Sequence, residues 1–206
     1  MTGYTALPLR LILPGLYQWT VAWPRYPLES YLIETDDGCI AIDPQDAHPN
    51  MFENSRSNVR HVILTNHYHE RAAAIWKHRY GATVWVPKAD MDDLETITAD
   101  EAYSKSSILP GGIQAVHLGG ITEGEHALLW PENRGVLFVG DALGTTSYWT
   151  HGEGELGAHP KFRPPTRLAK LLQLDFTSLV VGHGEPILDQ AKNALAKYLE
   201  LMAHDA

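Results

Sequence analysis

The sequence contains a single cysteine, Cys39, among its 206 residues. One thiol excludes an internal disulfide and any zinc site built from several cysteines, and it is typical of a reducing cytoplasm. Basic residues are also scarce: 16 Lys and Arg stand against 25 Asp and Glu, a formal charge of −9 with histidine neutral. Because a negative surface repels phosphate groups, we expect neither nucleic acid nor a membrane as a partner.

Long hydrophobic runs are absent as well. No stretch approaches the roughly 18 apolar residues of a membrane span. The first residues, 1–16, are interrupted by Pro8, Arg10 and Pro14 and do not predict a signal peptide, so we expect a cytoplasmic protein. With 44% hydrophobic and 20% charged residues the composition is that of a globular protein, and the length predicts one domain over residues 1–206.

Short β-branched or aromatic segments predict strands, and apolar residues three or four positions apart predict helices. The predicted strands are Leu16–Ala22, Glu29–Thr35, Gly38–Ile42, Val59–Thr65, Thr83–Val86, Ile113–Leu118, His126–Trp130, Val136–Val139 and Ser178–Val181. The predicted helices are Ala72–Tyr80, which Gly81 ends, and Ala89–Tyr103, Thr166–Gln173 and Gln190–Met202. Two strand-rich halves with helices attached favour a layered α/β or α+β domain.

Three apolar strands run directly into polar residues. The first is followed by His67 and His69, the second by Asp141, and the third by His183 between two glycines. Each residue alone is more often a turn or surface group than a ligand. Together, at the ends of buried strands, they predict a site, because α/β proteins build sites there. Since His67 and His69 are two residues apart, we expect both imidazoles to point the same way. Imidazole and carboxylate are the usual ligands of zinc, iron or manganese.

These segments resemble the metallo-β-lactamase-fold hydrolase superfamily along nearly the whole chain. The resemblance is carried by SYLIETDDGCIAIDP (30–44), LTNHYHERA (64–72), GGITEGEHALLW (119–130), VLFVGDAL (136–143) and VVGHGEP (180–186). It implies a four-layer αββα sandwich with the site along one edge. Of the seven ligand positions implied by the family pattern, His67, His69, Asp141 and His183 are retained. The other three are occupied by Arg71, Ala72 and Ile121.

The replacements predict at most one metal ion. The resemblance places the first ion on His67, His69, Asp141 and a histidine that Ile121 replaces, so three of its ligands remain. It places the second on Asp141, His183 and the two lost positions 71 and 72. Arg71 puts a permanent cation where the second ion would need a carboxylate. At about 4 Å and an effective dielectric near 20, each pair of unit charges repels by about 4 kcal/mol. The alternatives are therefore one divalent ion (zinc, iron or manganese) or none.

Arg71 itself has two interpretations. Its guanidinium could form a bidentate pair with Asp141, or it could bind an anionic small molecule. One hypothesis is a divergent hydrolase that acts on an ester, thioester or related bond, with Asp141 or His183 as general base and Arg71 on the developing oxyanion. The other is a metal-free, non-catalytic protein that binds a small anionic ligand or has a regulatory role. A nuclease is disfavoured by the acidic composition.

Overall fold

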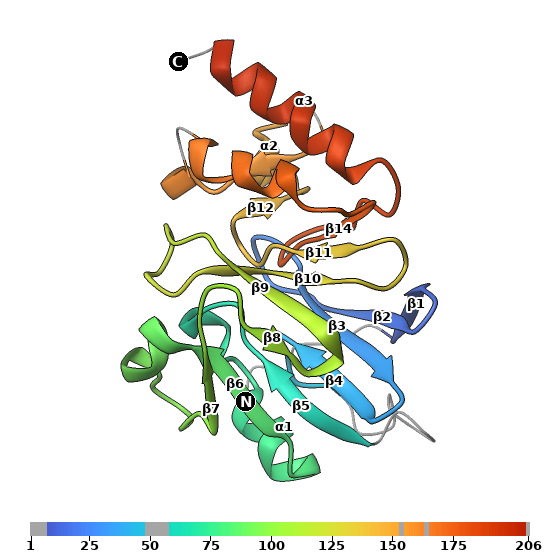
Figure 1. Cartoon of the computed structure of the whole chain (residues 1–206), viewed down its shortest axis with the longest axis vertical. Helices are drawn as coiled ribbons and strands as arrows, with labels where there is room; N and C mark the ends of the chain where they lie inside the picture. Colours follow the sequence, from blue (N-terminus) through green and yellow to red (C-terminus); the bar gives the residue numbers. More distant parts are fainter. Residues whose placement is uncertain (1–7, 48–57, 153–154, 163–164, 205–206) are drawn as a thin grey trace.

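Two β-sheets face each other between helices in this computed structural model (Figure 1), which describes residues 8–47, 58–152, 155–162 and 165–204. The first sheet runs in chain order through β1 (Arg10–Leu13), β2 (Leu16–Val21), β3 (Leu28–Thr35), β4 (Gly38–Ile42), β5 (Val59–Ile63), β6 (Thr83–Pro87) and β7 (Glu101–Tyr103). The second has the order β14 (Ser178–Val180), β11 (Val136–Phe138), β10 (His126–Trp130), β9 (Ile113–His117) and β8 (Ile108–Leu109). A small ribbon pairs β12 (Leu143–Gly144) with β13 (Gly157–Ala158).

The helices cover the outer faces. Helix α1 (Ala73–Tyr80) packs against the first sheet, and α3 (Ala191–His204) lies on the far side of the second (Figure 1). The short helix α2 (Ser147–Thr150) lies on the α3 side. This is the four-layer αββα sandwich that the resemblance predicted. No helix in the described part of the chain is long and apolar enough to cross a membrane.

Alternation along the strands builds the layers, because successive strand residues point to opposite faces. In β4, Ile40 and Ile42 enter the core between the sheets, whereas Ala41 packs with Trp76 of α1. In β11, Phe138 enters the inner core, while Leu137 faces the cluster that includes α3.

Most predicted strands are confirmed within a residue or two, and α1 ends at Gly81, whose φ of 67° is left-handed as expected for a C-terminal cap. Strand β1 was not predicted. The helix predicted at Ala89–Tyr103 is wrong: a 3₁₀ helix spans Lys88–Asp93, and β7 pairs with β6, because sheet pairing overrides weak helical spacing. The helix predicted at Thr166–Gln173 is instead a 3₁₀ helix at Ala169–Gln173, preceded by a 3₁₀ turn over 165–167.

The strand directions bring the polar strand ends together. Strands β4, β5 and β6 are parallel to one another in the first sheet, as are β11 and β14 in the second. Parallel strands end on the same edge of a sheet. The carboxyl ends of these strands are followed by four polar residues, Asp43, Thr65, Asp141 and His183, which therefore lie at the sheet edges where α/β proteins build sites.

Candidate functional site

A buried carboxylate at the end of β4 anchors the histidine segment. Asp43 Oδ1 accepts a hydrogen bond from the backbone N–H of Thr65 (2.8 Å), and Oδ2 accepts one from the Thr65 hydroxyl (2.7 Å). The same Oδ2 lies 2.9 Å from Nδ1 of His69, which is 1% exposed. Because a carboxylate only accepts, Nδ1 carries the proton, and Nε2 is the nitrogen left for another partner.

Asp141 meets two histidines through one oxygen. Its Oδ1 lies 3.1 Å from His69 Nε2 and 2.9 Å from His183 Nε2. His183 Nδ1 lies 2.8 Å from the carbonyl oxygen of Pro27, to which it donates, and the ring stacks on Trp149 with centroids 4.5 Å apart. Gly140 is required before this aspartate, because a Cβ on it would lie 2.7 Å from Thr65 Oγ1. The structure thus brings His69, Asp141 and His183 together from three segments.

The charges of this group are strongly coupled. Burial and Arg71 act to lower the pKa of His69, but Asp43 and Asp141 outweigh them and raise it to about 9. Burial acts to raise the pKa of Asp141, but His69 and His183 hold it well below its usual range. In the absence of any other cation, His69 is therefore protonated at neutral pH and Asp141 is ionised.

Two of the separations needed for a cation held by His69, Asp141 and His183 are present at Asp141 Oδ1. Both His69 Nε2 and Asp141 Oδ1 are buried, and neither has a hydrogen-bond partner of good geometry among the described residues. Zinc bonds of about 2.0–2.2 Å in tetrahedral geometry separate two ligand atoms by roughly 3.3 Å, close to the two separations at Asp141. The hydrogen bonds from Nδ1 of each ring to an oxygen are the usual support of a ligating histidine. The three ligand atoms do not all lie within 4.8 Å of one another, so one ion on all three would draw the imidazoles together.

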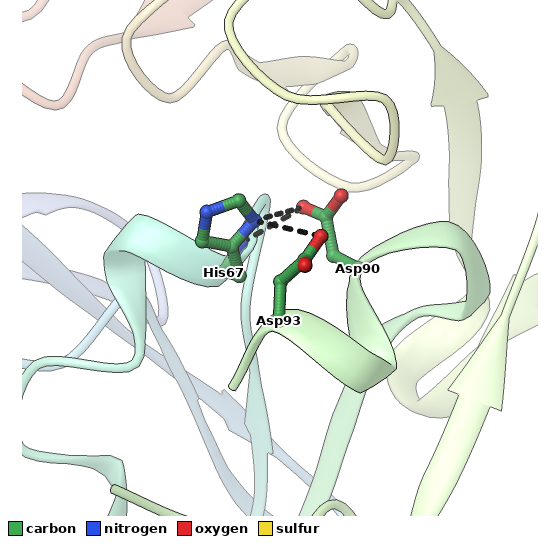
Figure 2. Close-up of side chains that lie close together, drawn as sticks. All are labelled: His67, Asp90 and Asp93. Carbon is green, nitrogen blue, oxygen red and sulfur yellow. Dashed lines mark hydrogen bonds and ion pairs between the residues drawn. The ribbon is translucent and has the colours of Figure 1, made fainter. Parts of the chain in front are cut away.

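His67 faces a different cluster, shown in Figure 2. Its Nδ1 lies 3.4 Å from Asp90 Oδ2 and 4.0 Å from Asp93 Oδ2, and its other ring nitrogen points away from both carboxylates. The expectation that His67 and His69 point the same way is wrong. The segment is a 3₁₀ turn over His67–His69, and with three residues per turn, positions two apart face different directions. That His67 is a ligand of the ion at Asp141 stays a prediction.

The cluster of His67, Asp90 and Asp93 offers ligand atoms within 4.8 Å of one another and could hold a divalent ion. Asp90, however, is fully buried and already accepts hydrogen bonds from His67 N–H (2.9 Å), the Thr122 hydroxyl (2.8 Å) and Gly124 N–H (2.7 Å). These bonds tie the turn 67–69 to the loop at Thr122 and Gly124. The main role of Asp90 is therefore to join segments.

Arg71 does not pair with Asp141. Among the residues that the structure describes, the ion-pair partners of Asp141 are His69 and His183. Arg71 Nη1 instead donates to the backbone carbonyls of Glu29 and Asp43, each at 3.4 Å. The bidentate pair between Arg71 and Asp141 that the sequence suggested is not formed, because His69 and His183 contact this carboxylate instead. Arg71 also has a φ of 32°, a left-handed conformation that is uncommon outside glycine.

A pocket of about 530 Å³ opens over these groups. Its lining includes the charged or titratable side chains His69, Arg71, Asp141 and His183. Tyr68 and Ile75, both partly exposed, contribute an apolar rim. The volume is that of a small-molecule site.

Two of the three lost ligand positions, Ala72 and Ile121, are apolar and buried. Ala72 lies in the cluster that packs on α1, and Ile121 in the cluster that includes α3. Sequence reasoning missed Glu125 near the site, whose pKa burial raises well above its usual range. Glu125 Oε2 accepts a hydrogen bond from Asn66 (2.8 Å), and Oε1 has no partner among the described residues. The sequence feature that could have indicated Glu125 is its position beside Gly124, between two predicted strands.

Glu29, on β3 next to Arg71, gives a prediction about stability. Burial raises the pKa of this carboxyl to about 7 from 4.5, although Thr20 and Gln18 donate hydrogen bonds to it. The folded state binds the proton more tightly, so stability falls as pH rises from 4.5 to 7 and stays lower above 7. At about 1.4 kcal/mol per pKa unit the full cost is about 3 kcal/mol.

Glu29→Gln should therefore stabilise the protein by up to about 3 kcal/mol at pH 8 and change little at pH 4.5. Denaturant unfolding at both pH values, with Glu101→Gln on the exposed edge strand β7 as control, measures this. Equal effects of Glu29→Gln at both pH values would contradict the buried, near-neutral carboxyl.

No family model matches the sequence, and no curated protein does. Solved structures do match. A metallo-β-lactamase from Pontibacter korlensis superposes with a TM-score of 0.74 at 17% identity, over 95% of this chain and 98% of that one. The chain has the metallo-β-lactamase fold. Two more structures agree with this assignment. FIM-1 from Pseudomonas aeruginosa, described in a mono-zinc form, has a TM-score of 0.69 at 14% identity and 97% and 96% coverage. A Cronobacter sakazakii metallo-β-lactamase with a HARLDQ motif has a TM-score of 0.68 at 15% identity, and the match covers 97% of this chain and 96% of that one.

Proposed function

We propose that the chain is a metallo-β-lactamase-like hydrolase that works with one divalent ion bound by His69, Asp141 and His183. The single observation that carries the proposal is the pair of imidazole nitrogens that face one buried carboxylate oxygen. The mono-zinc form described for FIM-1 supports a single ion on this fold. The expected substrate is a small molecule with an ester, thioester or related bond, which the pocket of about 530 Å³ is large enough to take.

The ion would polarise the scissile carbonyl and lower the pKa of a water molecule. Asp141 stays ionised at neutral pH, and both of its histidine contacts use Oδ1, so Oδ2 would be the oxygen placed to accept a proton from the attacking water. His183 is held by Pro27 and Trp149, and it fixes the orientation of Asp141. Asp43 and Thr65 do the same for His69.

A second ion has no place in this proposal. Arg71 lines the pocket as a fixed cation, and Ala72 and Ile121 offer no ligand atom. Because His69 has a pKa of about 9, a proton competes with the ion for Nε2, so we expect weak binding that strengthens as pH rises toward 9.

Hydrolysis is tested with p-nitrophenyl acetate, an aryl thioester and a chromogenic lactam, using chelator-treated protein before and after zinc is added. We expect zinc-dependent turnover of at least one of these substrates and its loss in Asp141→Asn. No turnover in any zinc-loaded sample would support the metal-free, non-catalytic alternative.

A further inference from the structure

Arg71 is a half-buried cation that forms no ion pair with any residue that the structure describes. The nearby carboxylates are engaged elsewhere: Asp43 with Thr65 and His69, and Asp141 with His69 and His183. Asp46, which shares the pocket, lies 3.6 Å from Arg79. No ion pair to Arg71 is formed within the described ranges of the chain. In a protein of net charge −9, a pocket-lining arginine left unpaired points to an anion from outside.

The guanidinium is oriented and has donors to spare. Both hydrogen bonds to backbone carbonyls come from Nη1. In the described structure Nη2 and Nε have no hydrogen-bond partner, and neither is a buried, unsatisfied atom. A guanidinium carries five N–H donors in a planar fork that matches a carboxylate through two parallel bonds. The left-handed backbone at Arg71 is a further sign of a functional position, since such strain gathers at binding sites.

Resting on the proposed function, we infer that the substrate is an apolar monocarboxylate whose carboxylate binds Nη2 and Nε of Arg71. Asp141 and Asp46 line the same pocket, so a doubly charged phosphate would meet more repulsion than a single carboxylate. Tyr68 and Ile75 expose apolar surface at the rim, which suits an aromatic or aliphatic body. This assigns Arg71 to the substrate carboxylate and not to the developing oxyanion.

The test is binding of three probes to metal-free, chelator-treated protein, so that it does not depend on turnover. Benzoate, the neutral isostere benzamide, and phenyl phosphate are titrated by calorimetry or ligand-observed NMR. We expect benzoate to bind at least 10-fold more tightly than benzamide and more tightly than phenyl phosphate. This comparison uses the unaltered protein and so needs no variant to fold.

Arg71→Gln should weaken benzoate at least 10-fold and leave benzamide unchanged. Arg71→Lys keeps the positive charge without the planar fork of donors, so its affinity for benzoate should lie between those of the unaltered protein and Arg71→Gln. Arg60→Gln, on the exposed side of β5, is the matched control and should bind like the unaltered protein. Equal affinity for benzoate and benzamide, or unchanged benzoate binding in Arg71→Gln, would overturn the proposal. Tighter binding of phenyl phosphate than of benzoate would overturn the choice of a carboxylate. A protein that binds benzoate as expected but hydrolyses nothing would refute the proposed function alone.

Discussion

Asp141→Asn should weaken zinc binding by more than about 100-fold, the upper end of what the loss of a supporting residue costs. The oxygen that faces both histidines is the charged member of the proposed set, and asparagine keeps its shape without its charge. Zinc titration of chelator-treated protein, followed by calorimetry, measures the change. His183→Gln should weaken binding too, by removing one ligand nitrogen.

Asp93→Asn is the control for this prediction. Asp93 belongs to the second cluster, 4.0 Å from His67, and its side chain is 62% exposed. If the ion binds at Asp141, Asp93→Asn should bind zinc like the unaltered protein. Loss of zinc in Asp93→Asn with retention in Asp141→Asn would place the ion at the cluster of His67, Asp90 and Asp93 instead.

The triple change Arg71→Asp, Ala72→His and Ile121→His should raise zinc stoichiometry from one toward two. It removes a cation, which at about 4 Å disfavours a divalent ion by roughly 8 kcal/mol, and it restores three ligands. Mass spectrometry of the metal content after dialysis against zinc measures the outcome. Because Ile121 is 9% exposed in an apolar cluster, we also expect a loss of stability of about 1–3 kcal/mol.

Arg71→Gln alone separates charge from ligand number, because it removes the cation and adds no carboxylate ligand. It should strengthen binding of the first ion, because the repulsion that also opposes protonation of His69 is removed. An unchanged stoichiometry in the triple variant, with the fold intact by circular dichroism, would show that the three positions do not complete a second metal site.

Much of the site could be predicted from strand ends. Asp141 and His183 follow β11 and β14, which are adjacent and parallel, so their meeting follows from pairing of two strands whose apolar patterns are clear. The rotation between His67 and His69 could not be predicted, because it depends on whether the turn between them is extended or 3₁₀. Asp90 was missed for a related reason. It lies in the segment predicted as a helix, and the path of this segment is determined by the pairing of β7 with β6.

The partner of Arg71 shows a different limit of sequence reasoning. Charge complementarity alone favours a pair with Asp141, and the sequence contains no reason against it. The outcome depends on the three-dimensional arrangement. His69 and His183 contact the carboxylate of Asp141, and Arg71 donates hydrogen bonds to backbone carbonyls instead. Both proposals rest on this arrangement. It gives a cation site at Asp141 and, in the same pocket, a guanidinium that is not paired with Asp141.

The central claim is one divalent ion bound at Asp141. Its most direct test is the metal content of untagged protein, purified without chelator and then dialysed at pH 8 against zinc, iron or manganese, by mass spectrometry. The account predicts about one ion per chain for at least one of the metals, and none in Asp141→Asn. Two ions per chain, or none under every condition, would contradict it.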